Sequence, residues 1–428
     1  MTTHFPLREK IEAGSQTAAA HRLVGSVGQK SLRRQNLRVV LHEVIEKGPM
    51  SRANIAEAVG LTKSTVSSLV SELMARGFLT EQGRAPVIGV GRPGRLVALS
   101  DQTVVGLGLE INVDYLAACV LDLTGGVRFE CFLRHENRGV PVRNVLDALG
   151  ELARSALNQA EAERLIPAGV TVAAPGLVEV ESGTLLTAPN LGWGETPLRN
   201  EVANRLQRPN LYVTADNEAN LAALGELWQG RGRQWGDFIH ISGEIGVGAA
   251  IVVDGELLRS GSGLGGELGH VSIDPDGAEC ACGSRGCLER AVGQEALLNK
   301  SRLDAEVGTS IGVPDGGVRL LAESAERGDQ ATLNALAEAG RALGLACGAA
   351  VNLLAPNTVV LGGIFAPLFG WLVGPLREEL EERAFVARCS DLAIVRSELG
   401  AAAAVRGAAS LTLRAVCADP YLVGSPGR

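Results

Sequence analysis

The hydrophobic pattern of this chain changes its period near residue 104, and that change constrains the fold more than any other feature. Before this point, apolar residues recur every three or four positions, which is typical of amphipathic helices. After it, short alternating segments and long helical segments follow one another, which is typical of an α/β protein. A chain of 428 residues also exceeds the size of one compact core. The sequence therefore predicts a small, mainly helical N-terminal domain followed by a larger α/β body.

The segment between residues 50 and 75 has the capping pattern of two short helices joined by a tight turn. Ser51 can cap a helix that ends at Gly60, and Thr62 can cap a following helix that runs to about Ala75. Two helices connected in this way form a helix-turn-helix. The second helix has one apolar stripe and carries short hydroxyl groups elsewhere, which allow it to lie deep in the major groove of DNA.

A Gly- and Pro-rich segment after this helix is typical of a β-hairpin wing. Phe78–Leu79 and Leu96–Leu99 have extended patterns on either side, and Gly91–Arg95 is a stiff segment that ends in guanidinium groups. Such a segment can enter the narrow minor groove of A·T-rich DNA. The residues expected to contact DNA are Lys63, Ser64, Thr65, Ser67, Ser68, Arg92 and Arg95. The alternative for residues 32–99 is a small helical oligomerisation bundle, which does not require a basic surface.

The charge of the chain is divided unevenly between its two parts. Residues 1–100 hold 14 Lys and Arg against 7 Asp and Glu, whereas the remaining residues hold 26 against 41. A basic head on an acidic body is expected when the N-terminal domain contacts phosphates, so double-stranded DNA is the expected partner. If the helix-turn-helix motif is left aside, the alternative is that the charged residues are distributed unevenly by chance.

These patterns divide the chain into a flexible arm over residues 1–28, a winged helix-turn-helix domain over 29–100 and an α/β body over 101–428. In the body, strands are expected near 104–111, 115–121, 126–133, 168–174, 211–215, 237–242, 247–253 and 357–361, and helices near 142–163, 330–354 and after 366. The N-terminus has no apolar signal segment, and no apolar run approaches the roughly 18 residues of a membrane span. The sequence therefore predicts a cytoplasmic protein.

The eight cysteines of the chain fall into two groups. Three of them crowd together at positions 280, 282 and 287, which favours metal binding over a disulfide framework in a cytoplasmic protein. The others have apolar neighbours and are expected to be small buried hydrophobic residues, namely Cys119, Cys131, Cys347, Cys389 and Cys417.

Three motifs of the body carry a resemblance to a known family. They read ISGEIGVGAAIVVDG over 241–255, GGELGH over 265–270 and CACGSRGCLE over 280–289. With shorter stretches that agree, including residues 189–193 and 216–220, they resemble the signature of the ROK family, which comprises repressors, open reading frames and sugar kinases. The resemblance covers residues 30 to about 415. It implies a two-lobed, actin-like (ribonuclease-H-like) sugar-kinase body with the sugar bound between the lobes.

Three departures from the family's kinase pattern indicate that the body is a sensor and not an enzyme. A kinase of this family has Asp-x-Gly-Gly-Thr where this chain has Glu110-Ile-Asn112, so the metal-orienting Asp and both glycines are missing. In this chain, the second phosphate loop carries Glu244 at the position where the phosphates of ATP would lie, and the negative charges would repel each other. The Asn-Asp pair that holds the catalytic base is Asn217-Glu218 in this chain.

The resemblance also implies the ligand-binding residues. The positions that hold sugar hydroxyls correspond to Asn190, Asn217, Glu218, Glu267, His270 and Glu289, although such residues can instead cap helices and satisfy loops. The predicted ligands of a closed, structural zinc site are His270, Cys280, Cys282 and Cys287, with unmetallated cysteines as the alternative. One ring nitrogen of His270 can bind zinc while the other faces the sugar.

The sequence therefore predicts a sugar-responsive transcriptional regulator, expected to repress genes of carbohydrate uptake or catabolism. It is expected to act as a homodimer or higher homo-oligomer whose operator affinity changes when a sugar or sugar phosphate closes the cleft. One alternative is an active ATP-dependent sugar kinase with an added DNA-binding domain. A second is a DNA-binding protein whose body serves only as a dimerisation scaffold.

Overall fold

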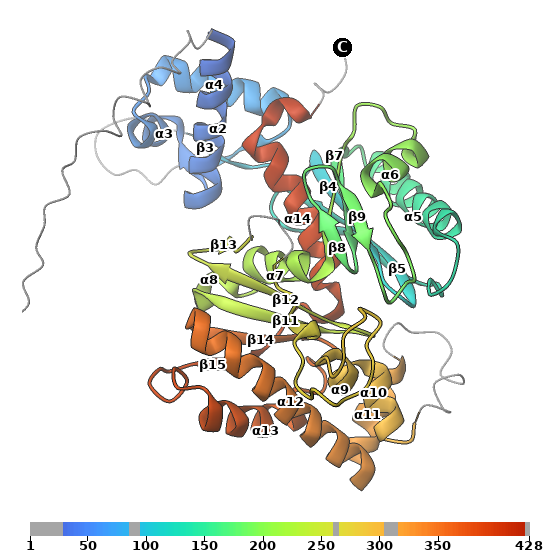
Figure 1. Ribbon diagram of the computed structural model, residues 1–428. Coiled ribbons are helices and arrows are strands. Elements are labelled where there is room, and N and C mark those ends of the chain that lie inside the picture. Colours follow the sequence, from blue (N-terminus) through green and yellow to red (C-terminus); the bar gives the residue numbers. More distant parts are fainter. Residues whose placement is uncertain (1–28, 85–94, 260–264, 304–315, 424–428) are drawn as a thin grey trace, which may run out of the picture.

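The computed structural model describes residues 29–84, 95–259, 265–303 and 316–423, and it is shown in Figure 1. The arm expected over residues 1–28 lies outside this part of the chain. The described residues form a small N-terminal domain and two lobes, each built around a five-stranded sheet.

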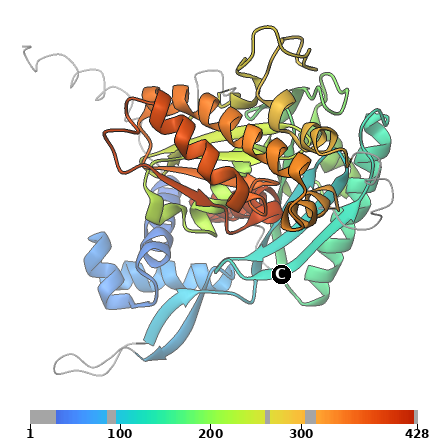
Figure 2. The same ribbon diagram turned by 90° about the horizontal axis from the view of Figure 1, so that it is seen from below.

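The N-terminal domain is the expected helix-turn-helix with a hairpin. Its elements are α2 (Gln29–Lys47), β1 (Met50–Ser51), α3 (Arg52–Val59), α4 (Lys63–Ala75), β2 (Leu79–Arg84) and β3 (Arg95–Leu99). Ser51 caps α3 and Thr62 caps α4 through their side-chain oxygens, and Gly60 ends α3 in the left-handed conformation, as predicted. Strands β2 and β3 pair antiparallel, and Figure 2 shows this hairpin extending away from the lobes. The two-residue strand β1, which pairs with β3, was not predicted because it is too short to show a pattern.

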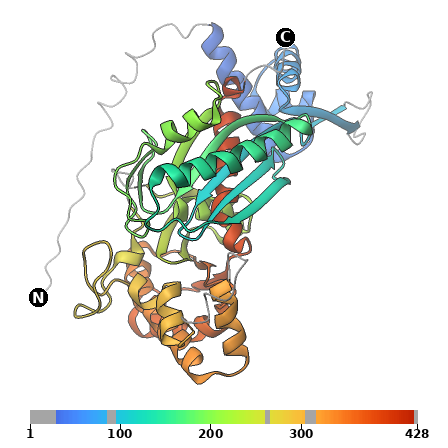
Figure 3. The ribbon, with the colours of Figure 1, turned by 90° about the vertical axis from the view of Figure 1, so that its right-hand side faces the viewer.

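The first lobe contains a mixed sheet in the order β10-β7-β4-β5-β6, in which β4, β7 and β10 are parallel. Its strands are β4 (Val104–Ile111), β5 (Tyr115–Asp122), β6 (Val127–Arg134), β7 (Ile166–Ala174) and β10 (Tyr212–Asn217). Helix α5 (Val142–Ala162) lies across one face of this sheet (Figure 3), and α14 (Ala403–Ala418) packs against the strands β4, β5 and β7. A hairpin of β8 (Leu177–Glu179) and β9 (Thr184–Thr187) and helix α6 (Leu198–Leu206) complete the lobe.

The second lobe repeats this topology, with the sheet order β13-β12-β11-β14-β15 and parallel pairing of β11, β14 and β15. Its strands are β11 (Phe238–Gly243), β12 (Val247–Val253), β13 (Glu256–Leu257), β14 (Thr358–Gly363) and β15 (Ala393–Arg396). Its helices are η1 (Leu268–His270), α9 (Glu289–Val292), α10 (Gln294–Lys300), α11 (Gly316–Glu326), α12 (Gln330–Leu354) and α13 (Phe369–Arg383). In both lobes, three consecutive strands pair antiparallel and two further strands extend the sheet in parallel. This shared arrangement confirms the predicted two-lobed body.

Two helices lie between the lobes and hold them together. Helix α7 (Glu218–Trp228) packs against α14 so closely that Cβ atoms at Gly225 and Gly407 would lie 2.3 and 1.8 Å from backbone oxygens of the facing helix. Only glycine permits this approach, since any side chain would separate the helices. The segment Gly400–Ala418, which includes η3 (Gly400–Ala402) and α14, is long and apolar enough to cross a membrane, but 61% of it is buried here as a core helix.

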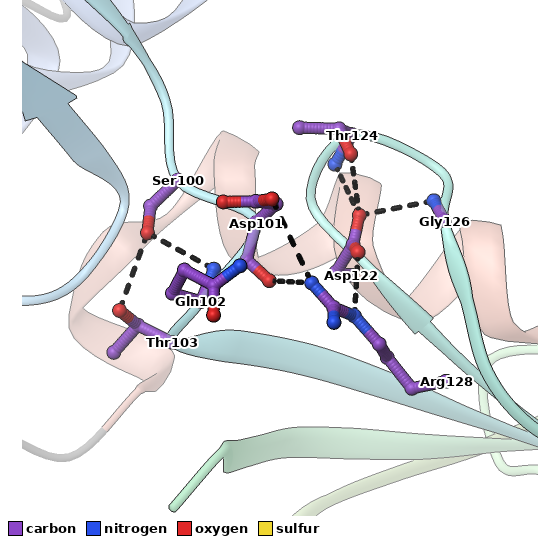
Figure 4. Close-up of polar contacts among 8 residues, drawn as sticks. All are labelled: Ser100, Asp101, Gln102, Thr103, Asp122, Thr124, Gly126 and Arg128. Atoms are coloured by element: carbon purple, nitrogen blue, oxygen red, sulfur yellow. Dashed lines mark hydrogen bonds and ion pairs between the residues drawn. The ribbon is translucent and has the colours of Figure 1, made fainter. Parts of the chain in front are cut away.

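The connection between the N-terminal domain and the first lobe is held in place by hydrogen bonds, which Figure 4 shows. Arg128 donates from Nη2 to the backbone oxygen of Asp101 and from Nε to Asp122 Oδ2, the latter at 2.8 Å. Ser100 Oγ accepts from Gln102 N at 3.3 Å and contacts Thr103 Oγ1 at 3.2 Å. The connecting residues 100–103 are therefore fixed to the turn between β5 and β6.

One prediction about the cysteines was wrong. Cys119 and Cys347 are buried and Cys131 and Cys417 are partly buried, but Cys389 is exposed. It lies in the turn after α13, where its backbone nitrogen donates to Val386. The apolar residues around it in the sequence cover the edge of the second lobe, and the cysteine itself points away from that core.

Candidate functional site

Two of the predicted sugar-binding residues meet where the lobes face each other. Asn190, which follows β9 in the first lobe, donates from Nδ2 to Oε2 of Glu289 at 3.2 Å. Glu289 begins α9 in the second lobe and also accepts from Val247 N at 3.3 Å. A Cβ atom at Gly246 would lie 2.5 Å from Glu289 Oε2 and 2.6 Å from Asn190 Nδ2, so a side chain there would displace these two groups.

Glu267 and His270 lie next to this pair, at the short helix η1. Glu267 Oε2 is 3.9 Å from Nε2 of His270. Burial and the nearby Glu289 carboxylate raise the pKa of Glu267, while His270 opposes the shift. The arrangement therefore gathers carboxylates and an amide from both lobes, which is the set of fixed acceptors and donors that a neutral, hydroxyl-rich ligand needs.

The predicted metal ligands are brought together by the loop that follows η1. The ligand atoms of His270, Cys280, Cys282 and Cys287 all lie within 4.8 Å of one another. Cys282 Sγ is 3.7 Å from Cys287 Sγ, and Cys280 Sγ is 3.7 Å from His270 Nδ1. Two thiolates on one tetrahedral zinc ion are separated by about 3.8 Å, because each Zn–S bond measures about 2.3 Å. The cluster therefore fits a metal ion.

The imidazole of His270 connects the metal cluster to the candidate sugar site. Its Nδ1 faces Cys280 while its Nε2 faces Glu267. A second link is the 3.7 Å contact between Cys280 Sγ and Glu289 Oε1. A metal held by this loop would fix the orientation of both carboxylates.

Asn217 makes the helix-capping contacts that the sequence left open as an alternative to sugar binding. Its Oδ1 caps α7 by accepting from Ala219 N and Asn220 N, and its Nδ2 donates to the backbone oxygen of Gly176 at 2.8 Å. These bonds match the helix-capping alternative, and they leave one Nδ2 hydrogen for a ligand. Asp216, which was not predicted as a site residue, lies beside it and binds both terminal nitrogens of Arg259.

Glu218 is partly buried within a cluster of carboxyl groups. Burial, followed by repulsion from Glu110, Glu289 and Glu267, raises the pKa of Glu218 to about 8. Its Oε2 is buried and has no hydrogen-bond partner among the described residues. At neutral pH most of this carboxyl group is therefore protonated, and a protonated acid cannot act as a general base.

Glu110 completes this cluster on strand β4. Burial raises the pKa of Glu110 to about 7, although its Oε1 accepts a hydrogen bond from Tyr115 Oη at 2.7 Å. Glu110, Glu218 and Glu244 line one cavity of about 10 Å³ at the start of α14, which is room for about one water molecule. The resemblance places the phosphates of ATP beside Glu244, which is one of these three carboxyl groups. The grouping was missed from the sequence because more than 130 residues separate its ends.

The predicted recognition helix α4 presents its polar face to solvent. Lys63, Ser64 and Ser68 are exposed, and Thr65 and Ser67 are half-buried. Ser68 Oγ also accepts a hydrogen bond from Arg33 on α2 at 3.3 Å, which adds an exposed guanidinium to this face.

Of the two predicted wing residues, the structure describes only Arg95. Arg95 is exposed at the start of β3 and pairs with Glu81 at 2.6 Å, so its guanidinium is partly neutralised by a carboxylate of the same hairpin. Arg92 lies outside the described residues. The described strands on either side of it, β2 and β3, pair antiparallel.

Comparison with known proteins agrees with this organisation. Residues 106–415 match the ROK family, and residues 46–83 match the IclR helix-turn-helix domain. The chain is 32% identical to a xylose repressor of Caldicellulosiruptor bescii over 92% of this chain and 99% of that protein.

Two solved structures share the fold. A ROK family transcriptional regulator, homologous to the E. coli MLC protein, is 25% identical, with a TM-score of 0.73 over 91% of this chain and 98% of its own. A Streptomyces griseus ROK glucokinase in complex with glucose and AMPPNP is 26% identical, with a TM-score of 0.61 over 72% of this chain and 98% of its own. The regulator therefore matches the chain over nearly its whole length, whereas the kinase leaves more than a quarter of it unmatched. The chain belongs to the ROK family and carries a helix-turn-helix domain in front of the family's two-lobed body.

Proposed function

We propose that this protein is a sugar-responsive transcriptional repressor of carbohydrate uptake or catabolism genes. The observation that supports the proposal is the joining of a helix-turn-helix to a body in which the predicted sugar-binding residues Asn190 and Glu289 meet across the lobes, while carboxyl groups gather beside the predicted phosphate site. The protein acts in the cytoplasm, where its operator is found, and it is not an enzyme.

Operator binding is assigned to α4 and the wing. Lys63, Ser64, Thr65, Ser67 and Ser68 contact the major groove, and Arg92 and Arg95 reach the adjacent minor groove. A homodimer places two such helices in successive major grooves about one helical turn apart. The nearly full-length similarity to a xylose repressor supports this assignment.

The sugar is held between the lobes by Asn190, Glu267, His270 and Glu289, with Asn217 and Glu218 at the edge of the same site. Because Asn190 and Glu289 already contact each other across the lobes, a sugar inserted between them exchanges that bond for bonds to its own hydroxyls. Xylose is the first candidate, given the function that the relative's name records.

Sugar binding is coupled to the operator through the lobes. A sugar bound between the lobes closes the cleft. The fixed connection at residues 100–103 transmits this movement of the lobes to the N-terminal domain. The spacing of the two recognition helices in the dimer then no longer matches the operator, and the affinity for DNA falls.

Zinc is the metal that suits the cluster of one imidazole and three thiolates. His270, Cys280, Cys282 and Cys287 would hold it with no position left for a catalytic water. Its role is therefore structural, and it would orient His270 and Glu289 toward the sugar.

The test is a gel-shift titration of operator DNA against sugars, beginning with xylose and glucose. We expect one sugar to weaken operator binding, and Glu267→Gln to abolish that response without weakening operator binding itself. The matched control is Glu279→Gln, since the Glu279 side chain is 77% exposed and pairs with Arg285. No response of the wild-type protein to any sugar would support a scaffold role for the body, an unchanged response in the Glu267→Gln variant would remove Glu267 from the sugar site, and sugar-dependent hydrolysis of ATP would support a kinase.

A further inference from the structure

A cavity of about 510 Å³ lies outside the sugar cleft, where the DNA-binding domain meets the body. Its walls come from α2, from the turn between β5 and β6, from the end of α7 and the following helix α8 (Gly232–Trp235), and from the C-terminal half of α14. These elements meet near the centre of Figure 1, at the junction of the N-terminal domain and the lobes. None of the proposed sugar, metal or DNA-contacting residues lines it.

Three guanidinium groups line this cavity, each from a different helix. They belong to Arg38 on α2, Arg233 on α8 and Arg414 on α14, and His42 adds an imidazole from α2. Arg233 lies 3.9 Å from the carboxylate of Glu46. Within the described part of the chain, no carboxylate lies within ion-pair distance of Arg38 or Arg414. Arg38 and Arg414 therefore face the cavity without a carboxylate at ion-pair distance, and Glu46 of the same cavity attracts Arg414 from farther away.

Arg414 is positioned at the wall of the cavity by an aromatic ring. Its guanidinium carbon lies 4.4 Å from the centre of the Trp228 ring, on which it stacks. Burial, followed by repulsion from Arg233, lowers the pKa of Arg414, and attraction to Glu46 opposes this shift. An oxyanion between these like charges would remove that repulsion.

The acidic residues of the cavity do not supply this anion. Asp122 is occupied, since its carboxylate accepts from Arg128 Nε at 2.8 Å and from the backbone nitrogens of Thr124 and Gly126 at 2.9 and 3.0 Å (Figure 4). Glu46 is the partner of Arg233, and Glu256 is exposed on β13. The arginines without close partners are therefore open to an anionic ligand.

We propose that this junction cavity binds a small metabolite that carries a phosphate monoester, separately from the sugar cleft. Guanidinium forks from Arg38 and Arg414 match the geometry of phosphate oxygens. The apolar lining, which includes Leu123 and Leu413, accepts the carbon skeleton. A volume of about 510 Å³ is in the range of small-molecule sites.

A ligand in this cavity contacts the parts that set the position of the DNA-binding domain. Residues 122–125 line the cavity, and Asp122 holds Arg128, which in turn holds the connection at Asp101 (Figure 4). Arg38 and His42 belong to α2 of the DNA-binding domain itself. Occupancy of the cavity is therefore expected to alter operator affinity, in addition to any effect of the sugar.

The test is calorimetric titration of the full-length protein with ribose 5-phosphate, glycerol 3-phosphate and inorganic phosphate, with ribose and glycerol as neutral controls. We expect saturable binding of at least one ester below about 1 mM, and no binding of the neutral compounds at the same concentrations. Arg38→Gln and Arg414→Gln should each weaken that binding by at least about tenfold. Arg319→Gln, on the exposed surface of α11, is the matched control and should bind normally.

Four results would overturn the proposal. They are the absence of saturable ester binding up to about 10 mM, unchanged binding in both arginine variants, loss of binding in the cleft variant Glu267→Gln, and equal affinity for inorganic phosphate and the esters. Retained operator binding and a normal thermal unfolding curve show that each variant is folded. Because Arg38 is exposed on the surface of α2, its substitution keeps the test usable if the Arg414 variant unfolds.

Discussion

The Oη of Tyr421 donates a hydrogen bond to Oε1 of Glu72 at 2.9 Å, which ties the last turn of the body, η4 (Pro420–Leu422), to the recognition helix α4. The same carboxylate accepts from Arg33 Nε at 2.8 Å, and the Arg76 guanidinium lies 4.0 Å from the centre of the Tyr421 ring. These bonds, together with desolvation that opposes them, leave the pKa of Glu72 below its ordinary value. The end of the chain therefore supports the helix that is proposed to contact DNA.

Replacing this hydroxyl tests the connection. Tyr421→Phe keeps the ring over Arg76 and removes only the hydrogen bond, so we expect a loss of roughly 1 kcal/mol or less in the free energy of unfolding. Amide hydrogen exchange should speed up in α4 before it changes in the lobes. Tyr212→Phe is the control, since its hydroxyl makes no hydrogen bond to a described residue. Unchanged exchange in α4 would contradict a supporting role for Tyr421.

Lys63 at the start of α4 is expected to contact a DNA phosphate. Lys63→Ala should weaken binding to all DNA sequences to a similar degree and reduce the slope of log affinity against log salt by about one. Fluorescence anisotropy at several salt concentrations measures both quantities. Lys300→Ala is the control, because Lys300 lies on the body and pairs with Glu338. An equal effect of the two substitutions would argue against DNA binding through α4.

Removal of the metal should loosen the second lobe. Elemental analysis is expected to find about one zinc ion per chain, and a strong chelator should lower the unfolding temperature by several degrees. Cys287→Ser should lose the metal and weaken sugar binding, because the loop that carries Glu267 and Glu289 is no longer fixed. Cys389→Ser, at an exposed cysteine outside the cluster, should retain both. Pure protein without zinc would disprove the metal assignment.

The buried carboxyl cluster should make stability fall as the pH rises. Burial and the neighbouring carboxyl groups raise the pKa of Glu218 from its ordinary value near 4.5 to about 8. The folded state therefore binds more protons than the unfolded state between these values, and each rise in pH within that window lowers the free energy of unfolding. Glu218→Gln removes the buried charge and should raise stability above pH 8 by roughly 2 kcal/mol or more, with little effect at pH 4.

Chemical denaturation across this pH range is the measurement for that variant. Glu381→Gln is a suitable control, since its carboxylate is exposed on α13. A variant whose stability follows the wild-type pH profile would show that Glu218 is charged in the folded protein.

Much of the fold was predictable from the sequence because its causes are local. The caps at Ser51 and Thr62, the wing strands and most strands of the body follow from residue spacing alone. The metal cluster was also predictable, since three of its four ligands lie within eight residues of one another and the fourth is ten residues away.

What the tertiary structure decided depends on contacts between distant parts of the chain. The sequence determined that the chain has a helix-turn-helix, a two-lobed α/β body and a loop of clustered cysteines suited to a metal ion. It gave no sign that Glu110, Glu218 and Glu244 share one buried space, or that Arg38 and Arg414 face one cavity. The reason is physical: the pKa of a carboxyl group and the repulsion between two guanidinium groups depend on burial and on distance through space. Neither quantity exists until α7 and α14 have packed between the lobes and brought those side chains together.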